Sequence, residues 1–76
     1  MIELVKYIAD QLVEHKADVH VEAFDEDGEI VIELEVAETD LGKVIGRQGK
    51  TARAVRLLLG AAGAKQKKRY ALEILE

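Results

Sequence analysis

The chain has 76 residues, of which 49% are hydrophobic and 34% are charged, and its formal net charge is -4. A chain of this length supports one small hydrophobic core, so we expect a single domain over residues 1–76. The absence of cysteine excludes disulfides and thiolate metal sites. The N-terminus lacks the features of a signal peptide, and the uncharged stretches are far shorter than the ~20 residues of a membrane-spanning helix. These features predict a cytoplasmic protein without a membrane segment.

The charged residues are distributed unevenly along the chain. Residues 1–40 contain thirteen acidic residues but only two basic ones, whereas residues 41–72 contain nine basic residues and no acidic one. Such asymmetry is typical of a protein with one half that binds a polyanion, because the local potential attracts a phosphate backbone. The alternative interpretation, in which the charges only solvate exposed faces, stays open on this observation alone.

The first half of the chain predicts one helix and a β-hairpin. Residues 2–15 carry apolar side chains at helical spacing and predict an amphipathic helix. Residues 19–24 and 29–36 alternate between apolar and polar side chains, and the sequence DEDG at 25–28 favours a turn between them. We therefore expect two antiparallel strands.

The second half predicts two helices and a last strand. A short helix is expected to end at about Ile45, with Thr39 or Asp40 as its N-cap. A longer helix follows Gly49, and residues 69–75 alternate as a strand. The order α-β-β-α-α-β predicts a two-layer α+β domain with a three-stranded sheet packed against three helices. The apolar positions at helical spacing in the longer helix are Ala52, Val55, Leu58, Leu59 and Ala62.

Two glycines interrupt helix-forming sequence in the stretch VIGRQGKT, residues 44–51. Glycine costs roughly 1 kcal/mol in a helix interior, so the pair indicates either a tight turn or a close approach to the backbone. The GKT ending does not complete a P-loop, because that motif needs a glycine at the position of Val44. Gly46 and Gly49 can instead adopt positive φ and let a sugar-phosphate strand approach. We expect the amides of Gly49, Lys50 and Thr51 to be free donors at the start of the next helix.

The segment VIGRQG, residues 44–49, resembles the hydrophobic-Ile-Gly-x-x-Gly signature of the KH domain. The element order resembles the type II arrangement, and DLGKVIGRQGKTARAVR with the closing LEILE is similar to small stand-alone bacterial KH proteins of the KhpA group. The resemblance covers essentially the whole chain. It implies a non-catalytic module that clamps about four nucleotides of single-stranded RNA between this loop and an apolar groove. One departure, Ala52 where a bulky aliphatic residue is common, predicts a shallower groove.

The motif and its resemblance together predict an RNA-binding site without catalytic residues, cofactor or metal. Arg47 and Lys50 supply positive charge beside the loop, and the resemblance places Ile45 at the groove. His15 and His20 are isolated and have no third ligand at metal-binding spacing. An enzyme is not expected, because no acidic residue lies near the basic loop and no nucleophile-base pair can be assembled. The predicted RNA-binding residues are Lys43, Ile45, Gly46, Arg47, Gln48, Gly49, Lys50 and Arg53.

Two other functions stay open. The resemblance implies self-association as a homodimer and a heteromeric complex with a larger KhpB/Jag-type RNA-binding protein, so the chain could act mainly as a protein-interaction subunit. The two short helices also allow helix-turn-helix DNA binding, although two glycines between them suit a strand clamp better than a groove-reading helix.

Overall fold

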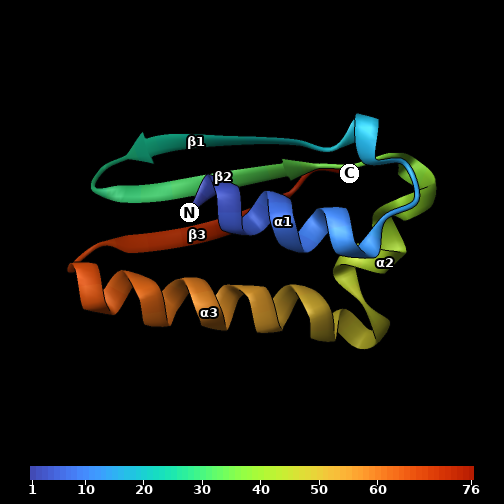
Figure 1. The fold of residues 1–76 in the computed structure, drawn as a ribbon. Helices are drawn as coiled ribbons and strands as arrows, with labels where there is room; N and C mark the ends of the chain where they lie inside the picture. Colours follow the sequence, from blue (N-terminus) through green and yellow to red (C-terminus); the bar gives the residue numbers. More distant parts are fainter.

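The helices and strands of the computed structural model, which describes residues 1–76, follow the predicted order (Figure 1). The helices are α1 (Ile2–Leu12), α2 (Leu41–Ile45) and α3 (Lys50–Gln66), and the strands are β1 (His20–Glu26), β2 (Glu29–Glu35) and β3 (Arg69–Ile74). Short 3-10 turns precede β1, α2 and α3. The α+β architecture and the α-β-β-α-α-β order are therefore confirmed.

The sheet has the strand order β1-β2-β3, with β1 and β2 antiparallel and β2 and β3 parallel. The hairpin turn consists of Asp27 and Gly28, which both have positive φ, as a two-residue turn of this kind requires. The parallel pair is joined by a crossover that contains α2 and α3, because a short turn cannot connect parallel strands. This crossover carries the glycine pair.

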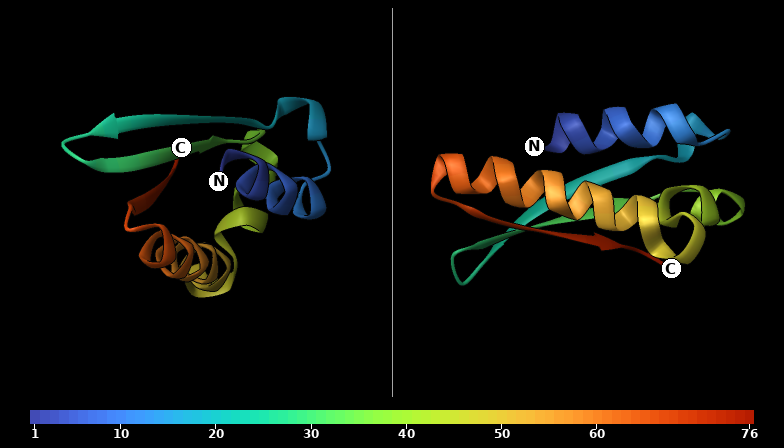
Figure 2. Two further views of the ribbon diagram at one scale, coloured as in Figure 1. Left: turned by 60° about the vertical axis from the view of Figure 1, so that its left-hand side comes forward. Right: turned by 90° about the horizontal axis from the view of Figure 1, so that it is seen from below.

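Both long helices cover the same face of the sheet, and the opposite face is bare (Figures 1 and 2). Alternate residues of each strand point to opposite faces, so Val21, Leu34 and Ile74 lie together on the helix side. On the bare side Glu33 is in register with Glu22 of β1 and Glu73 of β3. The sheet is thus apolar towards the helices, whereas its bare side carries this acidic row beside an apolar row of Phe24, Val31 and Ala71.

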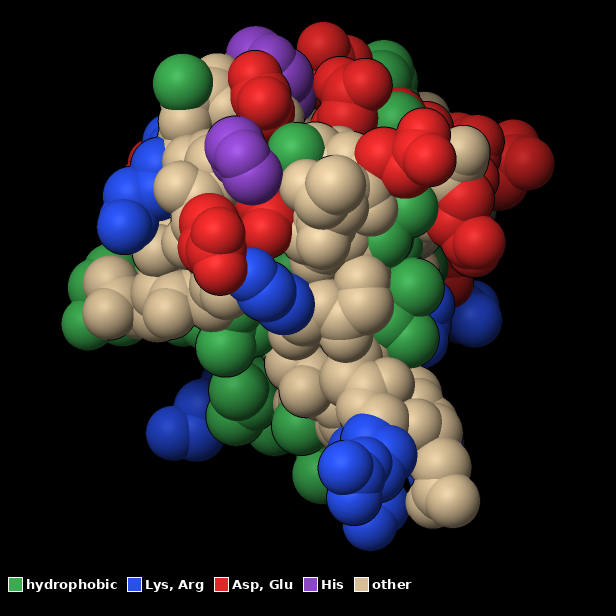
Figure 3. All heavy atoms as spheres, turned by 90° about the vertical axis from the view of Figure 1, so that its right-hand side faces the viewer, with side chains coloured by type: hydrophobic (Ala, Val, Ile, Leu, Met, Phe, Trp, Pro, Cys, Tyr) green, Lys and Arg blue, Asp and Glu red, His purple; other side chains and the backbone are tan.

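Acidic and basic side chains separate in space as they do in sequence. Seen from the end of the molecule at which α2 lies, Asp and Glu gather on the side of the sheet, and Lys and Arg lie mostly on the side of α3 (Figure 3). No helix combines the length and the apolar character that a bilayer crossing would need.

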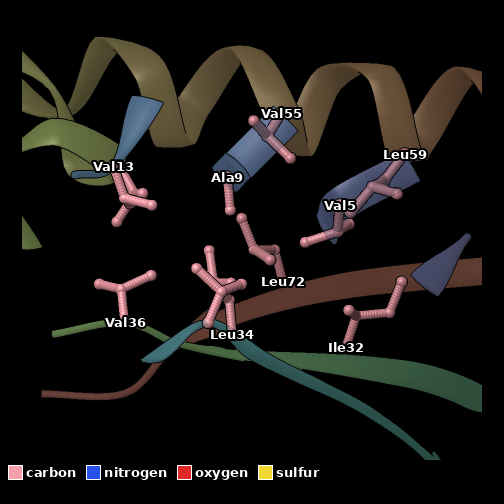
Figure 4. Close-up of a cluster of buried hydrophobic side chains, with 11 residues drawn as sticks. Val5, Ala9, Val13, Ile32, Leu34, Val36, Val55, Leu59 and Leu72 are labelled. Atoms are coloured by element: carbon pink, nitrogen blue, oxygen red, sulfur yellow. The ribbon is translucent and has the colours of Figure 1, made fainter. Parts of the chain in front are cut away.

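The core lies between the sheet and the stripes of α1 and α3 that face it (Figure 4). Ile32 of β2 and Leu59 of α3 are both 0% exposed. Full burial of such a side chain contributes roughly 1.5–3 kcal/mol. The buried cluster consists of Val5, Ala9, Val13, Val19, Ile32, Leu34, Val36, Val44, Val55, Leu59 and Leu72.

Some details differ from the sequence prediction. Strand β1 continues to Glu26 and does not end at residue 24, so the predicted turn at residues 25–28 shortens to Asp27 and Gly28. The first helix ends at Leu12 rather than at residue 15, because Val13 adopts an extended conformation and the next two amides bond to a side chain elsewhere. Leu58, expected in the core, is 53% exposed. The buried stripe of α3 comprises Ala52, Val55, Leu59 and Gly63, and Leu58 lies beside that stripe on the uncovered side of the helix.

Candidate nucleic-acid interface

The glycine pair forms a distinct turn between two helices. α2 ends at Ile45, a 3-10 turn spans Arg47–Gly49, and α3 begins at Lys50. Gly46 has φ 79°, Gln48 has φ 57° and Gly49 has φ 74°. The prediction that both glycines adopt positive φ is therefore confirmed, and the helix is interrupted here.

Gly46 is required for reasons internal to the fold. Its φ of 79° and ψ of 167° lie in a region that is essentially restricted to glycine. A Cβ added at this position would also lie only 2.7 Å from the backbone nitrogen and the Cβ of Thr51. The space beside Gly46 is thus occupied by the first turn of α3 and not left for a ligand.

Gly49 has different surroundings. A Cβ added there would have the Arg53 guanidinium as its one neighbour, at 3.4 Å. Its φ of 74° is left-handed, so glycine is needed for conformation while the space beside it is nearly open. Of the two glycines, Gly49 is the one at which a ligand could approach the main chain.

The backbone amides of the turn are less available than the sequence predicted. The N–H of Gly49 donates to the Gly46 carbonyl at 3.0 Å, and the N–H of Lys50 donates to the Arg47 carbonyl. The expectation that these two amides are free donors is therefore wrong, because the 3-10 turn satisfies them internally. Phosphate binding here would depend mainly on side chains and on the partial positive charge at the start of α3.

Four polar side chains surround the turn, and all are exposed: those of Arg47, Gln48, Lys50 and Arg53. Arg53, one turn into α3, donates from its guanidinium to the Gln48 carbonyl and so braces the left-handed residue. Ile45 is half-buried on the other side of the turn. With Gly46 and Gly49 themselves, the fold thus brings seven of the eight predicted site residues together at one end of the molecule.

Lys43 is directed elsewhere. Its ammonium donates to Glu14 Oε1 at 2.8 Å and lies 3.4 Å from Asp40 Oδ1. The hydrogen bond to Glu14 raises the pKa of Lys43, and the same bond lowers the pKa of Glu14. Lys43 is therefore paired with two carboxylates, unlike the cations at the turn.

Asp40 is at the position predicted for the N-cap of α2, but its side chain does not cap that helix. It is 1% exposed, and its oxygens accept the amides of Glu14 at 3.2 Å and His15 at 3.0 Å, with His15 Nδ1 at 3.1 Å. Burial favours the neutral acid, but the amides of His15 and Glu14, the His15 side chain and Lys43 together lower the pKa of Asp40 to about 2. We call Glu14, His15, Asp40 and Lys43 the clasp.

Thr51 and Asp40 are the two residues near the loop whose importance the sequence did not indicate. Thr51 lies two residues after Gly49, and only the structure shows that it packs against Gly46. Asp40 has the sequence signature of an N-cap. Only the tertiary structure brings the amides of Glu14 and His15 to its side chain. Ala52 is buried, and its effect on a groove stays a prediction.

A three-stranded sheet covered on one face by helices, in the order α-β-β-α-α-β and with a Gly-x-x-Gly turn between the second and third helices, defines a KH domain of type II. The family model described as KhpA/KhpB, KH domain, matches residues 2–74, so the chain belongs to this family. It is a non-catalytic family, in agreement with the prediction that the chain is not an enzyme.

Bacterial relatives match over nearly their full length. The chain is 47% identical to the RNA-binding protein KhpA of Halalkalibacterium halodurans over 100% of both chains. It is 49% identical to the protein of that name from Caldanaerobacter subterraneus, over 99% of this chain and 100% of the relative. The protein of that name from Borreliella burgdorferi is 43% identical, over 99% of this chain and 92% of the relative.

Proposed function

We propose that the chain binds single-stranded RNA and that the Gly-x-x-Gly turn holds the RNA backbone. The observation that carries the proposal is an exposed turn with an open side at Gly49 and three cationic side chains around it. Family membership supports an RNA ligand, since the relatives named above are RNA-binding proteins. An RNA ligand also agrees with the cytoplasmic location that the sequence predicts.

The residues at the turn would contact different parts of the RNA. Arg47 and Lys50 would pair with phosphates, and Lys50 does so at the first residue of a 17-residue helix, where the dipole favours anions. Arg53 has one guanidinium nitrogen engaged with the Gln48 carbonyl, which leaves further N–H groups for a phosphate. Ile45 would contact a base beside the turn. These contacts would supply the affinity over the roughly four nucleotides that a KH domain clamps.

The sharpest test is the double substitution Arg47→Asp with Gln48→Asp. Both side chains are exposed, and aspartate tolerates the left-handed conformation at position 48, so the fold should be retained. We expect retention of a labelled single-stranded RNA of about ten nucleotides, longer than the KH footprint, to be abolished. Fluorescence anisotropy measures the binding, and circular dichroism checks the fold.

A matched control separates the turn from net charge. Lys16→Asp with Gln11→Asp makes the same change in charge, because it also replaces one basic residue and one glutamine by aspartates, at exposed positions on and after α1. This variant should retain most of the RNA affinity. If both double variants lose RNA equally, or if neither does, the assignment of the turn is wrong.

The salt dependence gives a second measure. If roughly two to four phosphates are neutralised, log affinity should fall against log salt with a slope of about -1.4 to -2.8 for single strands. A flat response would contradict a phosphate-based clamp.

A second function, pairing with another protein, is favoured by exposed leucines on α3. Leu57 is 76% exposed and Leu58 is 53% exposed, and both lie on the side of α3 away from the core. A second copy of the chain, or a KhpB/Jag-type protein, could cover them. Leu57→Gln with Leu58→Gln should then shift the sedimentation coefficient towards that of a monomer without loss of RNA binding. A wild-type chain that sediments as a monomer at all concentrations would contradict homodimer formation.

A further inference from the structure

The position of α2 depends on contacts with the rest of the molecule. It has five residues, and Val44 is its one buried side chain. A helix this short is not stable by itself, because most of its residues lie within the unfavourable nucleus. Besides the apolar packing of Val44 and of the half-buried Leu41, α2 is tied to the end of α1 by the polar contacts of the clasp, through Asp40 before its first residue and Lys43 one turn later.

Movement of α2 would be passed directly to the glycine turn. The N–H of Gly46 donates to the Gly42 carbonyl of α2 at 2.9 Å, so the turn begins on the helix itself. On its other side Gly46 touches Thr51 with no room even for a methyl group. A shift of α2 relative to α1 would therefore also move the turn.

We propose that the clasp positions the Gly-x-x-Gly turn, and that Lys43 acts there as a positioning residue and not as a phosphate ligand. The geometry supports this division of the basic residues. Lys43 is bound to Glu14 and lies near Asp40, whereas Arg47 and Lys50 are exposed at the turn with no carboxylate partner. The inference rests on the proposed RNA function and adds the means by which the α1–α2 junction holds the binding turn.

The salt slope distinguishes a positioning residue from a ligand. Lys43→Ala leaves both amide hydrogen bonds to Asp40 in place, so the fold should be retained. Its RNA affinity should fall by about three- to thirtyfold, the range typical of coupling through packed networks. The slope of log affinity against log salt should stay at the wild-type value. Lys50→Ala, at a proposed phosphate contact, should reduce the magnitude of that slope by about 0.7.

Two further variants complete this set. Lys43→Arg keeps a donor for Glu14 and should restore affinity to near the wild-type level. Lys6→Ala removes the exposed pair with Asp10 on α1 and should change neither affinity nor slope. A Lys43→Ala variant with a reduced salt slope, or with unchanged affinity, would overturn the proposal.

Hydrogen exchange in the free protein tests the clasp without RNA. Asp40→Asn replaces one acceptor oxygen by a donor, so one of the two amides at the end of α1 loses its partner. Exchange at the Gly46 and Gly49 amides should accelerate in Asp40→Asn and in Lys43→Ala, while the amides of the β1–β2 ladder keep their wild-type rates. Unchanged exchange at the turn in both variants would contradict positioning. If the wild-type chain retains no RNA, the proposed function fails, but the exchange data still decide whether the clasp orders the turn.

Discussion

The hairpin turn and the Gly-x-x-Gly turn each contain two successive residues with similar positive φ values, but their surroundings are very different. Asp27 and Gly28 have φ values of 52° and 85°, and Gln48 and Gly49 have φ values of 57° and 74°. The hairpin turn is stabilised locally, with the Asp25 carboxylate accepting the Gly28 amide at 3.2 Å. The Gly-x-x-Gly turn is held by Thr51, by Arg53 and, through α2, by residues from the end of α1.

The comparison shows that the backbone conformation does not by itself make a binding site. The hairpin turn is surrounded by acidic side chains, and a phosphate would be repelled there. The other turn is at the start of a long helix with cations around it. What differs is the chemistry that the fold gathers around the same two left-handed residues.

The largest loss of stability is expected from Gly46→Ala, because no residue of the hairpin turn is as tightly constrained as Gly46. Its glycine-only dihedral angles and the contact with Thr51 should together destabilise the fold by about 3 kcal/mol or more. This is a large share of the roughly 4–11 kcal/mol expected for a domain of this size. Urea denaturation measures the loss. A loss no greater than that of Gly28→Ala would show that the turn relaxes around the added methyl group.

An intermediate effect is expected on acidification. The pKa of Asp40 is about 2 in the folded protein against an ordinary value of 3.8, so the unfolded chain binds the proton first. The stability that Asp40 contributes is therefore complete above about pH 4 and is lost as pH falls towards 2. The difference in free energy of unfolding between the wild type and Asp40→Asn should shrink over this interval. If this difference did not change with pH, it would contradict an ionised Asp40 carboxylate that the clasp stabilises in the folded protein.

The smallest effect on stability, and the most direct comparison, comes from Gly49→Ala and Gly28→Ala. Both positions are left-handed, and neither added Cβ would be closer than 3.4 Å to another group. Each variant should lose about 1–2 kcal/mol, the cost of a left-handed residue with a side chain. We expect RNA affinity to fall in Gly49→Ala, where the methyl group would obstruct the open side of the turn. Gly28→Ala should bind RNA as the wild type does.

The elements and the turn between α2 and α3 were largely predictable from local sequence. Alternation in the strands and the Asp27–Gly28 pair determine the hairpin, because a side-chain period of two and residues that accept positive φ act over a few positions. The same holds for Gly46 and Gly49. The resemblance to KH domains added the RNA ligand, which no periodicity indicates.

The tertiary structure alone decided which partners these residues meet. The apolar spacing of residues 2–15 predicts a longer helix than the one that forms, because Asp40, more than twenty positions later, takes the amides of Glu14 and His15. Leu58 has the spacing of a core residue, yet α3 lies at the edge of the sheet and nothing covers that side. Lys43 belongs to the basic half of the sequence but is bound by acids of the other half. Local sequence determines backbone conformation and side-chain period, whereas the pairing of distant charges and the coverage of a helix face depend on how the whole chain folds.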